Sequence, residues 1–156
     1  MRLPIDIGKF RIPNEEGTFG AVRKYDIHTG IDLYCREGTK VYAMEDGEIV
    51  GIEAFTGKEA GSPWWNYTIA ILIEGRHGVI CYGELNETES SGLFVGNKIK
   101  EGDLIGKIKQ VLRKNKGKPM SMLHLELYKH GTRKTVWWKH GEPKPEQLLD
   151  PRFGLF

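Results

Sequence analysis

Glycine and proline interrupt this chain so often that a long helix has little room to form. The sequence holds 20 glycines and 7 prolines spread over 156 residues. The runs between them are short and rich in β-branched and aromatic residues, which pack well on the pleated surface of a sheet. This pattern of short runs separated by glycine and proline therefore predicts an all-β protein built mostly of antiparallel strands.

The apolar runs between these interruptions predict seven strands. They lie at 31–35, 40–44, 47–54, 66–74, 77–83, 104–109 and 122–129. The Asp-Gly pair within 45–48 predicts a tight hairpin turn, because this dipeptide suits a two-residue loop. Residues 75–78 predict a second turn between two apolar strands. A short helical turn is expected at 145–149, since proline suits the first turn of a helix.

The segment Met122–Tyr128 alternates clearly. Its leucines occupy every second position and share one face of a strand, whereas Met122, His124, Glu126 and Tyr128 share the other. His124 is therefore expected on the polar face of a strand whose opposite face belongs to the core.

A second histidine stands four residues before an aspartate in the string His28-Thr-Gly-Ile-Asp32. Residues four apart in a strand point to one face, so both side chains can reach one ion. Together with His124 they form a set of two imidazoles and one carboxylate, which suits zinc and leaves a fourth position for water. On spacing alone, a pair of ordinary strand histidines explains the pattern equally well.

Several strings resemble, in the same order, those of the lysostaphin-type (LytM-like) zinc endopeptidases over most of the chain. They are Phe-Gly-Ala-Val-Arg (19–23), His-Thr-Gly-Ile-Asp (28–32), the segments 38–50, 66–73 and 79–85, Val95 through Gly106, His-Leu-Glu (124–126) and Leu-Asp-Pro (149–151). The resemblance implies one lysostaphin-type domain over 1–156, with the family's β-sandwich or half-open barrel of the duplicated hybrid motif. It also implies zinc bound by His28, Asp32 and His124 in a groove between loops.

Two departures fall where this family carries its non-ligand catalytic histidines. Glu84 replaces the histidine of the family's Tyr-x-His-Leu string, and Met122 replaces the first histidine of its His-x-His motif. A carboxylate can accept a proton from zinc-bound water, so Glu84 is a candidate base. It is equally compatible with an acidic surface residue or an additional zinc ligand. Met122 cannot replace a histidine, because a thioether donates no hydrogen bond.

Three hypotheses follow from these matches and departures. The favoured one is a degenerate member of the family that retains zinc and the groove, hydrolyses peptidoglycan peptides weakly or not at all, and binds a peptide, glycan or protein partner. The alternative is an active zinc endopeptidase on small-residue peptide cross-links, with Glu84 as general base. A metal-free structural module is disfavoured by the intact ligand set.

The distribution of charge restricts the partners. A net charge of +2 is too small to imply a polyanion partner for the whole chain. The segment 98–118 holds eight basic and two acidic residues, which would suit an anionic polymer. The favoured interpretation is that these lysines lie on exposed loops and edge strands, where they discourage aggregation. No aromatic residues alternate with the basic ones, so nucleic-acid binding has no support there.

The pairs Trp64-Trp65 and Trp137-Trp138 are each expected to place one indole in the core and one outside. Outer indoles beside a groove would hold a peptide or glycan, although capping of sheet edges is the favoured role. No export signal and no apolar stretch long enough to span a membrane is visible. A soluble protein is expected, in a family that is usually extracellular or in the cell envelope; its location stays open.

Overall fold

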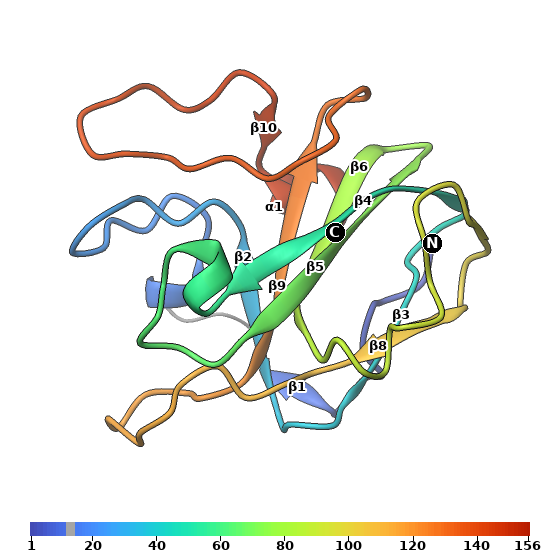
Figure 1. The fold of residues 1–156 in the computed structure, drawn as a ribbon. Coiled ribbons are helices and arrows are strands. Elements are labelled where there is room, and N and C mark those ends of the chain that lie inside the picture. The colour runs from blue at the N-terminus through green and yellow to red at the C-terminus, as the bar shows by residue number, and fades with distance from the viewer. Residues whose placement is uncertain (12–14) are drawn as a thin grey trace.

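The computed structural model describes residues 1–11 and 15–156 (Figure 1). A main sheet has the strand order β1-β2-β9-β6-β5-β4-β7, with β10 paired to β9, and β3 pairs with β8 in a separate small sheet. The strands are β1 (Phe10–Arg11), β2 (Ile31–Cys35), β3 (Lys40–Tyr42), β4 (Gly47–Thr56), β5 (Thr68–Gly75), β6 (Gly78–Leu85), β7 (Lys98–Ile99), β8 (Leu104–Lys107), β9 (Met122–Tyr128) and β10 (Leu148–Leu149). These pairings are antiparallel, which confirms the predicted fold class.

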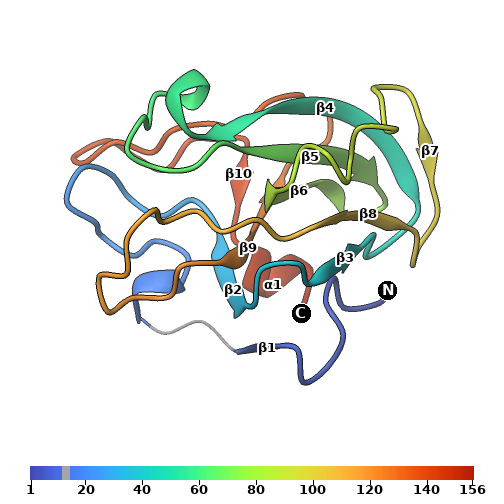
Figure 2. The same cartoon turned by 60° about the horizontal axis from the view of Figure 1, so that its bottom comes forward.

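The small sheet packs on one face of the main sheet (Figure 2). Val41 of β3 and Ile105 of β8 join the same buried cluster as Ile71 of β5 and the leucines of β9. Burial of this apolar surface is the main stabilising contribution to the fold. The leucine face of β9 is thus the core face, as the alternation predicts.

A second apolar cluster lies on the opposite face of the main sheet. It contains Leu72 of β5, Cys81 of β6 and Tyr128 of β9, and Val136 and Trp138 pack against it. The long segment between β9 and β10 therefore covers part of this face (Figure 1). His124 lies on the same side of β9 as Tyr128, so the polar side chains of β9 point towards the covered face.

The hairpin predicted at 45–48 is wrong. β3 pairs with β8 and β4 pairs with β5 and β7, so the chain passes from one sheet to the other here. Gly47 is needed for close approach to a neighbouring strand, because a Cβ on it would lie 2.5 Å from the carbonyl oxygen of Glu74. The turn predicted at 75–78 is confirmed as the connection between β5 and β6.

The helical turn predicted at 145–149 is also wrong. Pro145 begins a turn closed by the amide of Leu148, and Leu148–Leu149 is strand β10. The short helix α1 instead spans Pro151–Gly154, with the Asp150 carboxylate accepting a hydrogen bond from the Arg152 amide. An aspartate cap followed directly by proline is a stronger helix start than proline alone. Two 3-10 turns, η1 (Glu15–Gly17) and η2 (Lys58–Ala60), complete the described elements.

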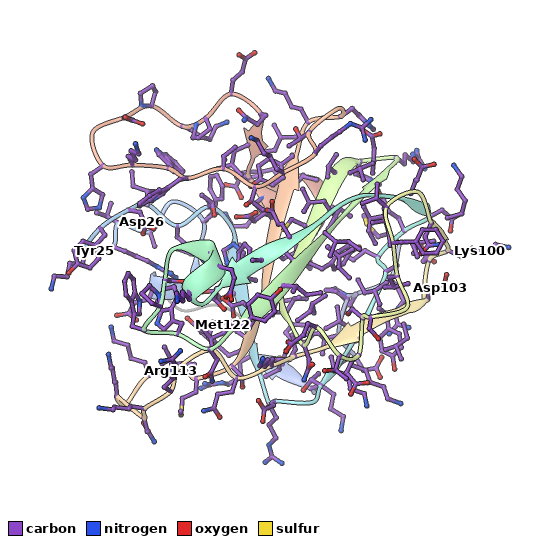
Figure 3. The ribbon with its side chains drawn as sticks, in the orientation of Figure 1. Tyr25, Asp26, Lys100, Asp103, Arg113 and Met122 are labelled. Atoms are coloured by element: carbon purple, nitrogen blue, oxygen red, sulfur yellow. The ribbon has the colours of Figure 1, made fainter. Side chains whose placement is uncertain are left out.

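The basic residues of segment 98–118 do not all lie on one surface. Lys100 and Arg113 lie towards opposite sides of the molecule (Figure 3). Four of the lysines form ion pairs with glutamates, at Lys98, Lys107, Lys109 and Lys118. This dispersion favours lysine-studded edges over a polyanion patch. Among the described residues, no helix is long and apolar enough to cross a membrane.

Candidate metal centre

Strands β2 and β9 bring Asp32 and His124 together. The two residues are direct partners in the antiparallel register, so their side chains leave the same face of the sheet. His28 precedes β2, and its imidazole reaches the same place. Asp32 Oδ1 lies 2.9 Å from His124 Nδ1 and 3.2 Å from His28 Nε2, and the two nitrogens are 3.2 Å apart. All three side chains are buried.

Partners of the outer ring nitrogens orient both imidazoles. His28 Nδ1 lies 2.8 Å from the carbonyl oxygen of Thr18, and His124 Nε2 lies 3.0 Å from Glu126 Oε2. Because both partners are acceptors, each is satisfied when the neutral ring carries its one proton on that outer nitrogen. The lone pairs of His28 Nε2 and His124 Nδ1 then point at the same site as the Asp32 oxygen. Three electron-pair donors that face one point are stabilised by a cation there.

The three atoms fit a metal ion. Ligands of a tetrahedral ion bound at 2.0–2.1 Å are separated by about 3.3 Å, and the separations here are 2.9–3.2 Å. Two imidazoles, one carboxylate and a carboxylate behind one imidazole form a donor set typical of metal sites. The ligand atoms of His28, Asp32 and His124 lie close enough together to hold one divalent ion.

The surroundings favour positive charge at this point. Burial raises the pKa of Asp32, but hydrogen bonds from His124 and His28 outweigh it and lower the pKa below its usual range. Burial likewise lowers the pKa of His124, but hydrogen bonds to Asp32 and Glu126 raise it to about 10. A cation, whether proton or metal, is thus strongly stabilised between these carboxylates.

Glu126 and Arg23 belong to the site, although the sequence alone did not single them out. Glu126 accepts hydrogen bonds from the hydroxyls of Thr29 and Tyr128, which fix its carboxylate behind His124. Arg23 donates to Asp32 Oδ2 at 3.1 Å. The spacing of Glu126 from His124 on one strand face was an available signal. Arg23 comes from a loop, where periodicity gives no signal.

Glu84 lies beside this cluster because of a β-bulge. Gly83 pairs with His124. Tyr82, just before Gly83, and Leu85, just after Glu84, both point into the core, so the alternation of side chains is interrupted between them. The register between β5 and β6 shifts at this point, and Glu84 has a φ of 70°, the one positive φ of a non-glycine residue in the described chain. A bulge redirects a side chain, and bulges are common next to active sites.

The Glu84 carboxyl is buried and incompletely hydrogen-bonded. Its Oε2 has no hydrogen-bond partner among the described residues. Burial and the nearby Asp32 carboxylate raise the pKa of Glu84 to about 8, and His124 and Arg23 oppose that rise. A buried polar atom without a partner is costly, so this oxygen marks a place where a ligand or water would bind. Glu84 is therefore not an acidic surface residue.

Met122 is half-buried and lies two residues before His124 on the same face of β9. Its direct partner on β2 is Tyr34. It lies towards the side of the molecule that carries Tyr25 and Arg113, away from Lys100 (Figure 3). The structure thus places Met122 one row of side chains from Asp32 and His124, with a thioether that can neither donate a hydrogen bond nor carry a proton.

A sheet of this kind with a His-Asp-His cluster defines a class of metallopeptidase-like domains. The profile of Peptidase family M23 matches residues 26–136. The chain belongs to Peptidase family M23, and it is a lysostaphin-type, LytM-like member of it. M23 peptidases are generally metalloenzymes that act on peptides. A comparison with curated protein sequences finds no match.

Solved structures share this fold at low identity. The catalytic domain of the antimicrobial peptidase lysostaphin from Staphylococcus simulans is 19% identical with a TM-score of 0.59, covering 92% of this chain and 90% of that one. The catalytic domain of the prophage-encoded M23 protein EnpA from Enterococcus faecalis, solved as a point mutant, is 20% identical with a TM-score of 0.59, covering 96% and 94%. The NMR solution structure of lysostaphin is 21% identical with a TM-score of 0.53, and the match covers 81% of this chain but only 42% of that one.

Both tryptophan pairs lie in loops, and only the second divides as expected, because Trp138 packs against a core cluster and Trp65 does not. Trp64 and Trp137 are exposed, at 57% and 63%, whereas Trp65 and Trp138 are partly covered. Trp138 packs against the second apolar cluster and against Phe19, which lies in the loop before His28. Trp138 therefore supports the loop before His28 rather than capping a strand edge.

Proposed function

We propose that this chain is a zinc-dependent peptide hydrolase in which Glu84 has taken over the handling of protons. The observation that carries the proposal is the buried Oε2 of Glu84, which lacks a hydrogen-bond partner in the described chain and lies beside the His-Asp-His cluster. His28, Asp32 and His124 would hold the ion. Zinc bound there supplies a Lewis acid that polarises a carbonyl group and lowers the pKa of water towards about 7.

Glu84 is suited to accept and return a proton. In this mechanism its carboxylate takes a proton from the attacking water and gives it to the leaving amine. A pKa of about 8 supports this role, because a general base works best when its pKa lies near the working pH. Arg23 donates a hydrogen bond to the second oxygen of Asp32, which helps to hold that carboxylate in position.

Substitution of Glu84 by glutamine tests this role. Glu84→Gln keeps the shape of the side chain but removes the base, so hydrolysis of peptidoglycan or small-residue peptides should fall by about 10²- to 10⁴-fold. Elemental analysis should still find about one zinc per chain, which a His124→Ala variant should lose. Glu59→Gln, an exposed glutamate on η2, is the matched control. Unchanged turnover in Glu84→Gln would remove this residue from the mechanism.

A second candidate function is a degenerate domain that retains zinc and binds a peptide, glycan or protein partner. The observation that favours it is Met122, which leaves no imidazole where the family has one. An imidazole that stabilises the oxyanion is worth about 10²- to 10³-fold in rate. Met122→His should therefore raise hydrolysis of the same peptides. Peptide binding without turnover in both proteins, with zinc present, would support the degenerate function.

A further inference from the structure

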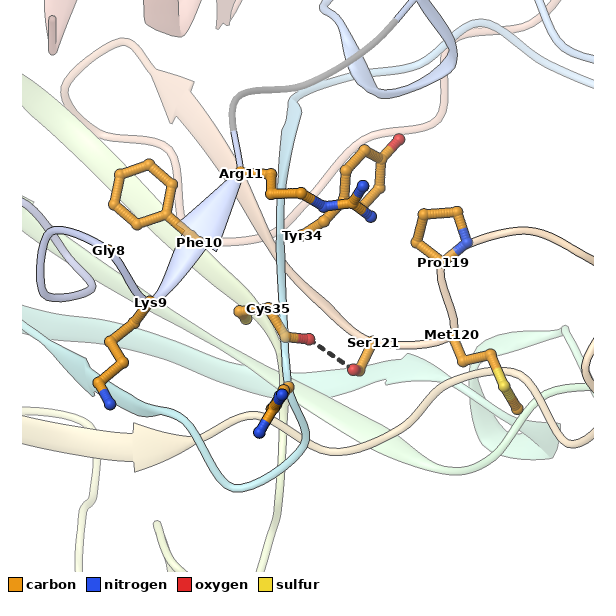
Figure 4. A pocket seen from close by; sticks show the side chains of 10 residues that line it. Gly8, Lys9, Phe10, Arg11, Tyr34, Cys35, Pro119, Met120 and Ser121 are labelled. Atoms are coloured by element: carbon orange, nitrogen blue, oxygen red, sulfur yellow. Dashed lines mark hydrogen bonds between the residues drawn. The ribbon is translucent and has the colours of Figure 1, made fainter.

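A pocket of ≈ 350 Å³ opens beside the N-terminal strand β1. Its walls come from three segments that are far apart in the sequence. Lys9 and Arg11 come from β1 and the residue before it, Tyr34 and Arg36 from the end of β2, and Met120 from the segment that leads into β9. The Arg11 guanidinium lies over the Tyr34 ring, and Ser121 donates a hydrogen bond to the Cys35 carbonyl oxygen across the pocket wall (Figure 4).

The charge lining this pocket is entirely positive. Lys9, Arg11 and Arg36 contribute three cations, and no acidic residue lines it. Within the described chain, none of the three side chains forms an ion pair or a hydrogen bond. Three unpaired cations around one pocket produce a local positive potential that attracts an anion.

Asp6 and Glu37, which line the adjoining pocket together with Lys9 and Arg36, and Glu16 have other partners in the described chain. Glu37 accepts a hydrogen bond from the Gln110 amide at 2.7 Å, and Asp6 pairs with Arg2 at 2.6 Å. Glu16 lies 3.6 Å from Lys118. None of these three carboxylates forms an ion pair with Lys9, Arg11 or Arg36, so the three cations can bind an external anion.

The register places this pocket directly beside the metal centre. Arg11 pairs with Tyr34, and Tyr34 pairs with Met122, so the three side chains form one row on one face of the sheet. Asp32 and His124 form the next row on that face, two residues further along. Rows two residues apart are separated by about 7 Å. An extended peptide advances about 3.3–3.6 Å per residue, so two or three residues reach from one site to the other.

We propose that this pocket binds the carboxylate of a peptide ligand whose chain continues over the metal centre. A guanidinium matches a carboxylate with two parallel hydrogen bonds, and the pocket presents Arg11 and Arg36. Tyr34 and Met120 provide apolar surface for the residue that carries the carboxylate. That the same peptide also reaches the metal centre rests on the proposed function. Under that function the preferred substrate carries a carboxylate two or three residues from the cleaved bond. Binding of the carboxylate itself does not depend on hydrolysis.

The test compares two peptides that differ in one charge. Acetyl-trialanine with a free carboxylate and the same peptide as its terminal amide are titrated into the full chain, with and without zinc, and the dissociation constants are measured by NMR. The free carboxylate should bind about fivefold more tightly, and amide signals of Arg36 and Ser121 should shift. Arg11→Gln and Arg36→Gln should each remove most of this preference.

Arg76→Gln is the matched control, because Arg76 is an exposed arginine in the turn between β5 and β6. Its dissociation constants should equal those of the unmodified chain, and the thermal midpoints of all variants should agree. Equal binding of the two peptides, or a carboxylate preference that survives both arginine substitutions, would overturn the inference. The zinc-free protein keeps the test separate from the proposed function, since a carboxylate preference there persists even if the chain hydrolyses nothing.

Discussion

At the scale of single residues, Glu126 controls what His124 can bind. The carboxylate holds the outer nitrogen of His124, and Thr29 and Tyr128 hold the carboxylate. A lost hydrogen bond at this position frees the ring to rotate or to change its tautomer, and either change withdraws the lone pair from the metal centre.

Glu126→Gln should weaken zinc binding by about 10- to 100-fold, the usual cost of losing a carboxylate behind a metal-bound histidine. Competition with a chromophoric chelator measures the change. Glu142→Gln, at an exposed glutamate in the segment between β9 and β10, should leave the affinity unchanged. An unchanged affinity in Glu126→Gln would mean that packing against Phe55, whose ring centroid lies 5.0 Å from that of His124, is sufficient to orient the imidazole.

At the scale of elements, the approach of β2 to β9 determines the separation of the ligands. Gly30 lies just before β2, where a Cβ would collide with the Leu125 carbonyl oxygen and lie 2.9 Å from His124 Nε2. Both approaches are closer than real Cβ contacts allow. Glycine at this position therefore lets the first ligand loop close onto β9.

Gly30→Ala should destabilise the fold by about 1–3 kcal/mol, because backbone atoms must move to make room. It should also reduce zinc affinity, since the movement separates Asp32 from His124. Chemical denaturation and chelator competition measure the two effects. Gly92→Ala provides the comparison, because its Cβ would meet nothing within 4 Å. Equal stability of the two variants would show that the strands do not need this close approach.

At the scale of the whole molecule, the metal centre makes the zinc-free fold sensitive to pH. Burial is the main cause that raises the pKa of Glu84 from 4.5 to about 8, and hydrogen bonds to Asp32 and Glu126, acting against burial, raise that of His124 from 6.5 to about 10. Through these two groups the native state binds more protons than the unfolded chain above about pH 5, where Asp32 and Glu126, whose pKa values are lowered, are ionised in both states. Under that condition the free energy of unfolding decreases as the pH rises.

The zinc-free protein should lose stability progressively between about pH 5 and pH 10, by up to about 1.4 kcal/mol per pH unit for each group between its unfolded and its folded pKa. Glu84→Gln should flatten the fall in the free energy of unfolding between pH 4.5 and about 8. The fall that is due to His124 should remain. Urea denaturation in the presence of a chelator, repeated across this range, measures both. If the stability of Glu84→Gln depends on pH in the same way as that of the unmodified chain, Glu84 does not titrate in the site.

The sequence by itself determined the features that depend on local pattern. The alternation of Met122–Tyr128 placed the leucines in the core and His124 on the other face, because side chains alternate along any strand. The four-residue spacing of His28 and Asp32 predicted a shared target, but the strand assumed for both is wrong for His28, which lies in the loop before β2. The two-residue strands β1, β7 and β10 were too short to show any alternation, so they went unpredicted.

Only the tertiary structure decided which distant segments meet. Asp46-Gly47 has the composition of a hairpin turn, yet β3 pairs with β8, because burying Val41 and Ile105 against the main sheet outweighs a local turn preference. The bulge that turns Glu84 towards the metal centre arises from the register of β5 against β6, and the contact of Arg23 with Asp32 arises from loop packing. Such long-range pairings leave no periodic trace in the sequence, because their energy comes from neighbours that only folding brings together.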